Sequence, residues 1–165
     1  MPLEIRPATT ADIEKIRQLC QPLVDEGVLL GKELVELYES VQEFIVGYQD
    51  DQLIACGALH VMWEDLAEVR TLVVDPEHHR SGVGSKLLDL LLKNAATLGV
   101  ERVFCLTFEV DFFGNHGFQK ITDSPVEPEV YEEMVRSHDE GVAEFLDLAR
   151  VKQNTLGNTR MLKVL

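Results

Sequence analysis

A loop with two glycines, placed between an Asp-Pro turn and an apolar helical segment, is the part of the sequence that most directly suggests chemistry. Gly82 and Gly84 follow a strand-like segment that stops at Pro76, and leucines at helical spacing come after them. Glycine lets the backbone approach a ligand closely, and the unpaired N–H groups of a helix N-terminus point toward that ligand. Because the helix dipole adds a partial positive charge, the loop predicts a pyrophosphate site. A plain glycine-containing turn is the alternative interpretation.

Two familiar phosphate loops and a metal site fit this segment poorly. Lys86 follows Gly84-Ser85 instead of coming directly after the second glycine, as in a P-loop, and no third glycine completes the dinucleotide-binding pattern. His78 and His79 are adjacent in a turn, so their side chains diverge, and no third metal ligand lies nearby. We therefore expect no metal and assign these histidines to contact with phosphates.

Two charged residues on a strand form the second chemical feature. Glu68 and Arg70 are two positions apart among apolar neighbours, so their side chains project from the same face. Such a pair is either a solvated ion pair or part of a polar pocket, and the pattern alone leaves both interpretations open.

The elements that must position these residues alternate along the chain. We expect strands at 3–6, 44–48, 53–62, 68–75, 102–107, 117–121 and 161–165. Helices are expected after Thr9, at 32–39, from the glycine loop to Gly99, at 109–116, and in an acidic insert at 123–157. This order predicts a single-domain α/β fold over 1–165, with a central twisted mixed β-sheet flanked by helices.

Composition limits the partners and the compartment. The net charge of −14 repels nucleic acid and anionic membrane surfaces, so neither is expected as a partner. The apolar runs are too short to span a bilayer, and the N-terminus shows no signal segment. Cys20, Cys56 and Cys105 are far apart in apolar surroundings, which indicates reduced core thiols and a cytoplasmic protein.

The glycine loop resembles the acetyl-CoA loop of the GNAT acetyltransferase superfamily. In that family Arg/Gln-x-x-Gly-x-Gly/Ala follows a strand, and here His79 and Arg80 precede Gly82 and Gly84. The resemblance covers nearly the whole chain and implies the GNAT fold with acetyl-CoA as co-substrate. The residues that it assigns to acetyl-CoA are Leu72, Val73, Val74, His79, Arg80, Ser81, Gly82, Val83, Gly84, Ser85 and Lys86.

A finer resemblance points to the acetyltransferase domain of N-acetylglutamate synthases. The segments 27–32, 37–44, 56–59, 68–74, 106–108 and 157–162 are similar to that family and occur in its order. Many relatives carry an amino-acid-kinase domain ahead of this one, whereas this chain resembles the short stand-alone type of actinobacteria. The resemblance implies acetyl transfer to the α-amine of glutamate, the first step of arginine biosynthesis, or of glutamine.

The same resemblance assigns roles to individual side chains. Glu68 falls where these enzymes place a carboxylate near the acceptor amine, and it would take a proton, through water, before the amine attacks. Thr107 falls at a Ser or Thr that hydrogen-bonds the departing thiolate or the acceptor. Lys32 falls at a basic position for the acceptor carboxylate, and Arg70 and Arg160 are further candidates for that role.

The implied mechanism is direct transfer in a ternary complex, with no acyl-enzyme. Acetyl-CoA would lie where the strand carrying Glu68 diverges from the strand 103–107, because divergence leaves backbone N–H groups free. Phe113 stands where many GNAT enzymes have a tyrosine that protonates the thiolate. Since phenylalanine cannot donate a proton, either the thiolate leaves unprotonated, as its pKa of about 8.5 allows, or Thr107 or a water assists.

Other functions fit the same sequence. A different GNAT enzyme would acetylate an amine, a peptide N-terminus or an antibiotic, and acidic walls would then surround the acceptor. A non-catalytic acyl-CoA-binding module would keep the glycine loop and show no turnover. The insert at 123–157 is a candidate contact for a homodimer.

Overall fold

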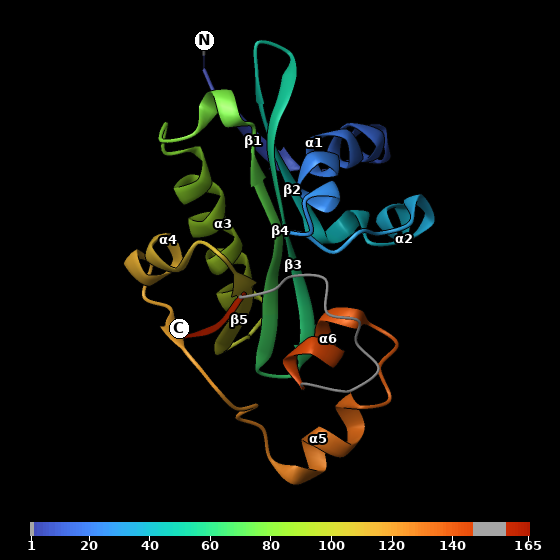
Figure 1. Cartoon of the computed structure of the whole chain (residues 1–165), viewed down its shortest axis with the longest axis vertical. Coiled ribbons are helices and arrows are strands. Elements are labelled where there is room, and N and C mark those ends of the chain that lie inside the picture. Colours follow the sequence, from blue (N-terminus) through green and yellow to red (C-terminus); the bar gives the residue numbers. More distant parts are fainter. Residues whose placement is uncertain (1, 147–157) are drawn as a thin grey trace.

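The chain folds around one seven-stranded β-sheet with helices on both sides (Figure 1). This computed structural model describes residues 2–146 and 158–165. The strands are β1 (Glu4–Pro7), β2 (Phe44–Gln49), β3 (Gln52–Trp63), β4 (Leu66–Val74), β5 (Arg102–Thr107), β6 (Gln119–Lys120) and β7 (Thr159–Val164). Their spatial order is β1-β2-β3-β4-β5-β7-β6. Only β4 and β5 are parallel neighbours among these described strands, so the expected mixed sheet is confirmed.

The helices cover the two faces of the sheet separately. They are α1 (Ile13–Asp25), α2 (Leu34–Glu39), α3 (Val83–Thr97), α4 (Val110–Asn115), α5 (Pro128–Met134) and α6 (Glu140–Phe145), with short 3-10 turns at Thr10–Asp12, Val41–Glu43 and Pro76–His78. In Figure 1, α1 and α2 lie on one side of the long β3–β4 hairpin, and α3 and α4 lie on the other. Ile13 and Ile16 of α1 pack with Val46, while Leu87 of α3 packs with Val69 in a separate core.

The short 3-10 turn that leads into α1 begins after Thr9, where the sequence predicts a helix to start. Thr9 and Asp12 form a reciprocal capping box, and the buried Asp12 side chain also accepts hydrogen bonds from Arg6 and Tyr48. The hydrogen bonds from Arg6 hold the pKa of Asp12 below its usual range. This cluster ties β1 and β2 to the first helix.

A β-bulge in β4 changes the face to which its side chains point. Arg70 pairs with Ala58, and Val73 pairs with Cys56, so two residues of β4 lie opposite one residue of β3. Thr71, inside the bulge, has a φ of 57°, a conformation that β-branched residues rarely adopt. Because the bulge shifts the alternation by one residue, Arg70 and Val73 both face the side of the sheet that α1 covers.

The parallel strands β4 and β5 separate soon after they begin. Their pairing starts at Leu66 with Arg102 and ends at Glu68 with Phe104. Beyond this point β5 continues to Thr107 while it stays paired with β7. The predicted divergence is confirmed, and it leaves one edge of β4 open where the bulge lies.

The insert covers the end of the sheet near the β3–β4 turn. Met134 of α5 and Val142 and Phe145 of α6 pack against Leu66 and Phe104. The rings of Phe104 and Phe145 meet edge to face, with centroids 5.0 Å apart. The rest of the expected helical insert, residues 147–157, lies outside the described residues.

Two expected elements differ from the structure. The helix predicted at 32–39 begins at Leu34, so Lys32 precedes the helix instead of starting it. The strand predicted at 117–121 is only Gln119–Lys120, because Gly117 has a φ of 89° and still belongs to the turn after α4.

Candidate active site

A cavity of about 1140 Å³ opens where β4 and β5 diverge. At one end it is lined by the glycine loop, including Gly82 and Gly84. At the other end it is lined by Lys32 from the segment before α2, by Glu68 and Arg70 of β4, and by residues of α6. Both features that the sequence analysis connected with a reaction, the glycine loop and the Glu68–Arg70 pair, therefore line the same cavity.

The glycine loop has the geometry of an anion site. Gly82 is the N-cap of α3 with a φ of 84°, and the helix starts with the hydrogen bond from the Lys86 N–H to the Gly82 carbonyl. The N–H groups of the first turn have no partner within the helix. A β-carbon at Gly82 would meet no atom within 4 Å, whereas one at Gly84 would lie 3.5 Å from Phe112. The space in front of Gly82 is thus open to a ligand such as a pyrophosphate.

Most residues assigned to acetyl-CoA line this cavity. The lining includes Leu72, Val73, Val74, His79, Arg80, Gly82, Val83, Gly84 and Ser85. His79 Nε2 lies 2.8 Å from the Val74 carbonyl oxygen, which ties the loop to the end of β4. Ser81 and Lys86 are not among the described lining residues; the Ser81 hydroxyl donates to the His78 carbonyl, and Lys86 is exposed.

Thr107 and Phe113 lie near the middle of the cavity. Thr107 is buried at the end of β5, and its Oγ1 accepts a hydrogen bond of 2.7 Å from the Glu109 N–H. Its own hydroxyl proton can therefore still be donated. Phe113 lines the same cavity and packs edge to face against Phe112 and Phe118. The aromatic ring supplies shape here, but no proton.

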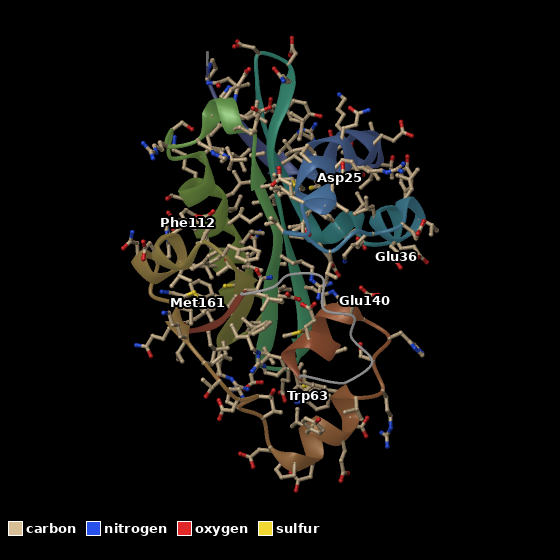
Figure 2. The ribbon with its side chains drawn as sticks, viewed as in Figure 1. Asp25, Glu36, Trp63, Phe112, Glu140 and Met161 are labelled. Atoms are coloured by element: carbon tan, nitrogen blue, oxygen red, sulfur yellow. The ribbon has the colours of Figure 1, made fainter. Side chains whose placement is uncertain are left out.

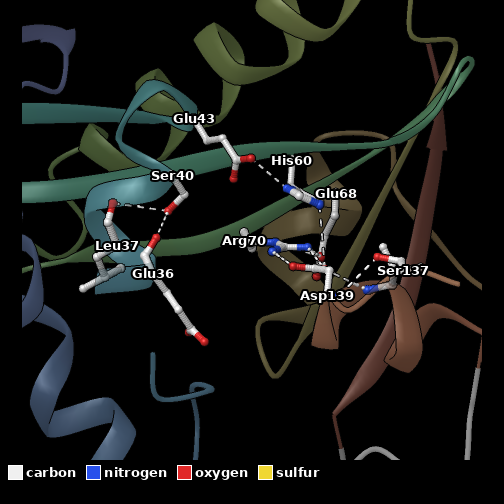
Figure 3. A network of polar contacts seen from close by, with 10 residues as sticks. Glu36, Leu37, Ser40, Glu43, His60, Glu68, Arg70, Ser137 and Asp139 are labelled. Atoms are coloured by element: carbon white, nitrogen blue, oxygen red, sulfur yellow. Dashed lines mark hydrogen bonds and ion pairs between the residues drawn. The ribbon is translucent and has the colours of Figure 1, made fainter. Parts of the chain in front are cut away.

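The centre of the acceptor side is a buried guanidinium between two carboxylates (Figure 3). Arg70 donates to Glu68 Oε1 from Nε at 3.0 Å and from Nη2 at 2.6 Å. It also donates to Asp139 Oδ1 from Nη1 at 2.9 Å and to Asp139 Oδ2 from Nη2 at 2.7 Å. The Arg70 side chain is only 9% exposed and the Glu68 side chain 7%. The sequence interpretation of a polar pocket, not a solvated pair, is therefore correct.

Charge pairing outweighs burial in this network. Burial lowers the pKa of Arg70, but Glu68 and Asp139 reverse that effect and raise it above its ordinary value. Burial likewise raises the pKa of Asp139, but the hydrogen bonds and charge of Arg70 bring it below its usual range. His60 extends the network, with Nδ1 2.7 Å from Glu43 Oε2 and Nε2 3.8 Å from Asp139 Oδ2.

Helix α6 lies directly against the Glu68–Arg70 pair. A β-carbon at Gly141 would come within 2.4 Å of both Arg70 Nη2 and Glu68 Oε1. Asp139 is the N-cap of the helix and accepts from the Val142 N–H, so one carboxylate both starts α6 and binds Arg70. Figure 2 shows Glu140 where α6 approaches the sheet. The insert thereby forms one wall of the cavity.

Three further residues near the Glu68–Arg70 pair were not predicted from the sequence. Asp139, Glu144 and His60 line the cavity, yet the first two lie in an acidic region that is typical of a solvated surface. Burial, followed by the charges of Glu68 and Glu140, raises the pKa of Glu144 to about 7. The one available signal was the Asp-Glu-Gly order at 139–141, which fits a helix N-cap.

The three cations predicted to hold the acceptor carboxylate have different surroundings. Lys32 lines the cavity. Arg70 also lines it, but its donors already bind two protein carboxylates. Arg160 is not among the described lining residues; its guanidinium lies 5.7 Å from the ring centroid of Phe104 and donates to the Phe145 carbonyl. Arg160 thus packs against the insert instead of lining the cavity.

Within residues 2–146 and 158–165, no three His, Cys, Asp or Glu side chains gather closely enough to hold a metal ion. No helix in these ranges has the length and apolar character needed to cross a bilayer.

Comparison with known proteins identifies the family. The profile of the Acetyltransferase (GNAT) family matches residues 12–118. An amino-acid acetyltransferase of Mycobacterium tuberculosis is 51% identical over 164 residues, which cover 98% of this chain and 94% of that protein. This chain belongs to the GNAT acetyltransferase family. The family resemblance of the glycine loop is therefore confirmed.

Solved structures agree with this GNAT assignment. A Mycobacterium tuberculosis protein, crystallised with CoA and a second ligand, superposes with a TM-score of 0.93 at 51% identity and covers 98% of this chain and 99% of its own. N-acetylglutamate synthase from Neisseria gonorrhoeae, complexed with coenzyme A and N-acetyl-glutamate, gives a TM-score of 0.79 at 26% identity. The match covers 100% of this GNAT chain and 35% of the Neisseria chain. The predicted GNAT fold is confirmed.

The left-handed conformation of Gly82 predicts how the loop responds to substitution. Gly82→Val should weaken acetyl-CoA binding by about 10- to 100-fold, since a strained φ costs about 1–3 kcal/mol and each decade is about 1.4 kcal/mol. Gly82→Asn is the matched control, because asparagine tolerates the left-handed conformation. Calorimetric titration with acetyl-CoA measures the affinity of both variants. Binding of the valine variant within twofold of the parent would show that the pyrophosphate does not depend on this loop.

Proposed function

We propose that this GNAT protein transfers the acetyl group of acetyl-CoA to the α-amine of glutamine or glutamate, by direct attack in a ternary complex. The observation that carries this proposal is one cavity lined both by the glycine loop and by the Glu68–Arg70–Asp139 network. The acetyltransferase from Mycobacterium tuberculosis and the Neisseria synthase support an amino acid as the acceptor.

The acetyl-CoA half of the proposal rests on backbone groups. The pyrophosphate would bind the N–H groups at the start of α3, with His79 and Arg80 nearby. The pantetheine arm would lie along the open edge of β4, where pairing with β5 ends at Glu68. The N–H of Leu72 or Val74 would hold the thioester oxygen as negative charge develops on it.

Side chains of the acceptor half supply proton transfer and orientation. Glu68 faces the cavity and would take a proton from the acceptor amine through water. Thr107, which keeps a free hydroxyl proton, would assist the departing thiolate. No acyl-enzyme is needed: burial raises the pKa of the Cys105 thiol, and the hydrogen bond to Cys20 together with burial raises that of Cys56. Neither thiol is a reactive nucleophile.

The charge of the cavity favours glutamine over glutamate. The described lining holds the carboxylates of Glu26, Glu36, Glu39, Glu43, Glu68, Glu109, Asp139, Glu140 and Glu144, whereas its lysines and arginines are Lys32, Arg70 and Arg80. An additional side-chain carboxylate on the acceptor would enter this negative field at a cost. The same acidic walls suit an amine or a peptide N-terminus, which makes acetylation of such an acceptor the second candidate function.

A substrate panel tests the proposal directly. Purified protein is mixed with acetyl-CoA and with glutamine, glutamate, a polyamine or a short peptide, and thiol release is followed with a chromogenic reagent. We expect turnover with glutamine and glutamate, with the larger kcat/KM for glutamine. Turnover with the polyamine or the peptide alone would establish the second candidate. No turnover with any acceptor, together with acetyl-CoA binding, would indicate a non-catalytic module.

Glu68→Gln should abolish most turnover while acetyl-CoA still binds. Loss of general-base assistance costs about 100- to 10,000-fold in rate. Initial rates between pH 7 and 9, with acetyl-CoA affinity measured on the same protein, give the result. A fall of less than about threefold over that range would remove Glu68 from the reaction.

Lys32→Met should raise the acceptor's KM and leave the KM of acetyl-CoA nearly unchanged. A hydrogen bond to a charged group contributes about 1.5–3 kcal/mol, which corresponds to about 10- to 150-fold at about 1.4 kcal/mol per decade. Lys93→Met, an exposed lysine of α3, is the matched control. An amino-acid amide, which lacks the α-carboxylate, should be nearly insensitive to Lys32→Met. Equal KM values for parent and variant would exclude Lys32 from acceptor binding.

The cysteines bear on the compartment in which the protein works. Cys20, Cys56 and Cys105 are free, buried thiols, which suits the reducing cytoplasm that we propose. A homodimer contact through the insert stays a prediction.

A further inference from the structure

We propose that Glu144, on helix α6 of the insert, is a second catalytic carboxyl of this cavity and receives the proton that the acceptor's ammonium group loses before attack. This inference rests on the proposed function, since it assigns a role in acetyl transfer to an amine. It adds a residue of α6, which lies outside the residues 12–118 that the GNAT profile matches.

The position of α6 directs Glu144 toward Glu68. Gly141 lies so close to the ion pair that its β-carbon would come within 2.4 Å of Glu68 Oε1. Glu144 is three residues further along the same helix, and residues at this spacing share a helix face. Both carboxyl side chains line the cavity. Glu68 and Glu144 therefore approach the acceptor from two different walls, β4 and α6.

The orientation of α6 is fixed independently of Glu144. Asp139 caps the helix through the Val142 N–H and binds Arg70 through both carboxylate oxygens. Phe145, at the end of the helix, is fully buried and packs edge to face on Phe104. Anchored at both ends, the helix holds Glu144 at the cavity wall.

The two carboxyls have contrasting surroundings. Glu68 receives two hydrogen bonds from Arg70. Within the described part of the chain, no hydrogen bond or ion pair joins the Glu144 side chain to another residue. The charged groups that face Glu144 are Glu68 and Arg70 on β4, and Asp139 and Glu140 on α6, three negative charges against one positive charge. Burial together with this excess raises the pKa of Glu144 to about 7.

A pair of carboxyls in such different environments can divide proton transfer between them. A carboxyl that titrates near neutral pH is well matched to act as a general base there. A free α-amine is mainly an ammonium ion at neutral pH, because its pKa is about 8 or higher. Glu144 is thus the group in the cavity best suited to take the first proton.

The proton balance uses both carboxyls. The R–NH₃⁺ group gives one proton to the Glu144 carboxylate, and the resulting R–NH₂ attacks the thioester carbonyl carbon. The new C–N bond forms and the C–S bond breaks, while the second proton leaves nitrogen through Glu68 and its water and ends on the CoA sulfur. Glu144 returns its proton to solvent. The products are the N-acetyl amino acid, CoA thiol and one proton.

The pH profile of a conservative variant tests this assignment. Glu144→Gln is compared with the parent, with Glu144→Asp, and with Glu132→Gln, an exposed glutamate of α5 in the same insert. For the parent we expect kcat to rise with pH through about 7. Glu144→Gln should lose about 100-fold in kcat at pH 7, with the rising limb shifted to higher pH, where the amine deprotonates by itself. Glu144→Asp should restore part of the limb, and the KM of acetyl-CoA should stay within about twofold in every variant.

A second readout does not depend on turnover. The folded protein binds a proton at Glu144 more tightly than the unfolded chain does, where the pKa of glutamate has its ordinary value of 4.5. Protonated Glu144 therefore contributes fully to stability below pH 4.5, and this contribution is lost as the pH rises through about 7. The melting temperature of Glu144→Gln should therefore rise relative to the parent between pH 5 and pH 8, whereas Glu132→Gln should follow the parent.

The outcomes separate this inference from the function on which it rests. A Glu144→Gln variant with the parent's kcat-against-pH curve would overturn the role of Glu144 while acetyl transfer stands. A melting-temperature difference that does not change with pH would overturn it as well. A parent protein that acetylates no amino acid or amine would overturn the proposed function and this inference with it.

Discussion

The half of the cavity that we propose for the acceptor depends on one buried ion-paired side chain, Arg70. A guanidinium that is 9% exposed needs partners on all sides, and it has them in Glu68 and Asp139. Removing one partner of such a buried pair costs about 3–5 kcal/mol, because the other charge is left uncompensated. Since Asp139 also caps α6, the same interaction that fixes Glu68 holds the insert against the sheet. Arg70 therefore serves to hold the site together, because its donors already bind Glu68 and Asp139 instead of a substrate.

The other half depends on backbone geometry. The bulge at Thr71 and the early end of the β4–β5 pairing leave the edge of β4 open, and Gly82 starts α3 in a conformation that suits glycine. Because the bulge lies directly after Arg70, the open backbone edge begins where the ion pair ends. One strand thus carries both the carboxylate proposed to act on the amine and the N–H groups proposed to hold the thioester. In this proposal a single strand positions both reactants for attack.

The sequence predicted the parts of this site that local patterns encode. Leucines at helical spacing and the glycines at 82 and 84 identified α3 and its loop, and the alternation of Glu68 and Arg70 placed both on one face of a strand. Long-range contacts were not predictable in the same way. Asp139 lies 69 residues from Arg70, and nothing around it distinguishes it from the other acidic residues of the insert. Arg160 was expected in the pocket because of its charge, yet it packs on Phe104 and Phe145, since a guanidinium stacks on aromatic rings.

We propose that both reactants occupy this one cavity, with the acceptor nitrogen between β4 and α6. A crystal structure of the protein with CoA and N-acetylglutamine would show where each reactant binds. We expect the pyrophosphate on the N–H groups that follow Gly82, and the acetamide nitrogen within hydrogen-bond or single-water reach of Glu68 and Glu144. An acetylated amino acid bound outside this cavity, or with its nitrogen turned away from both carboxyls, would overturn this proposal.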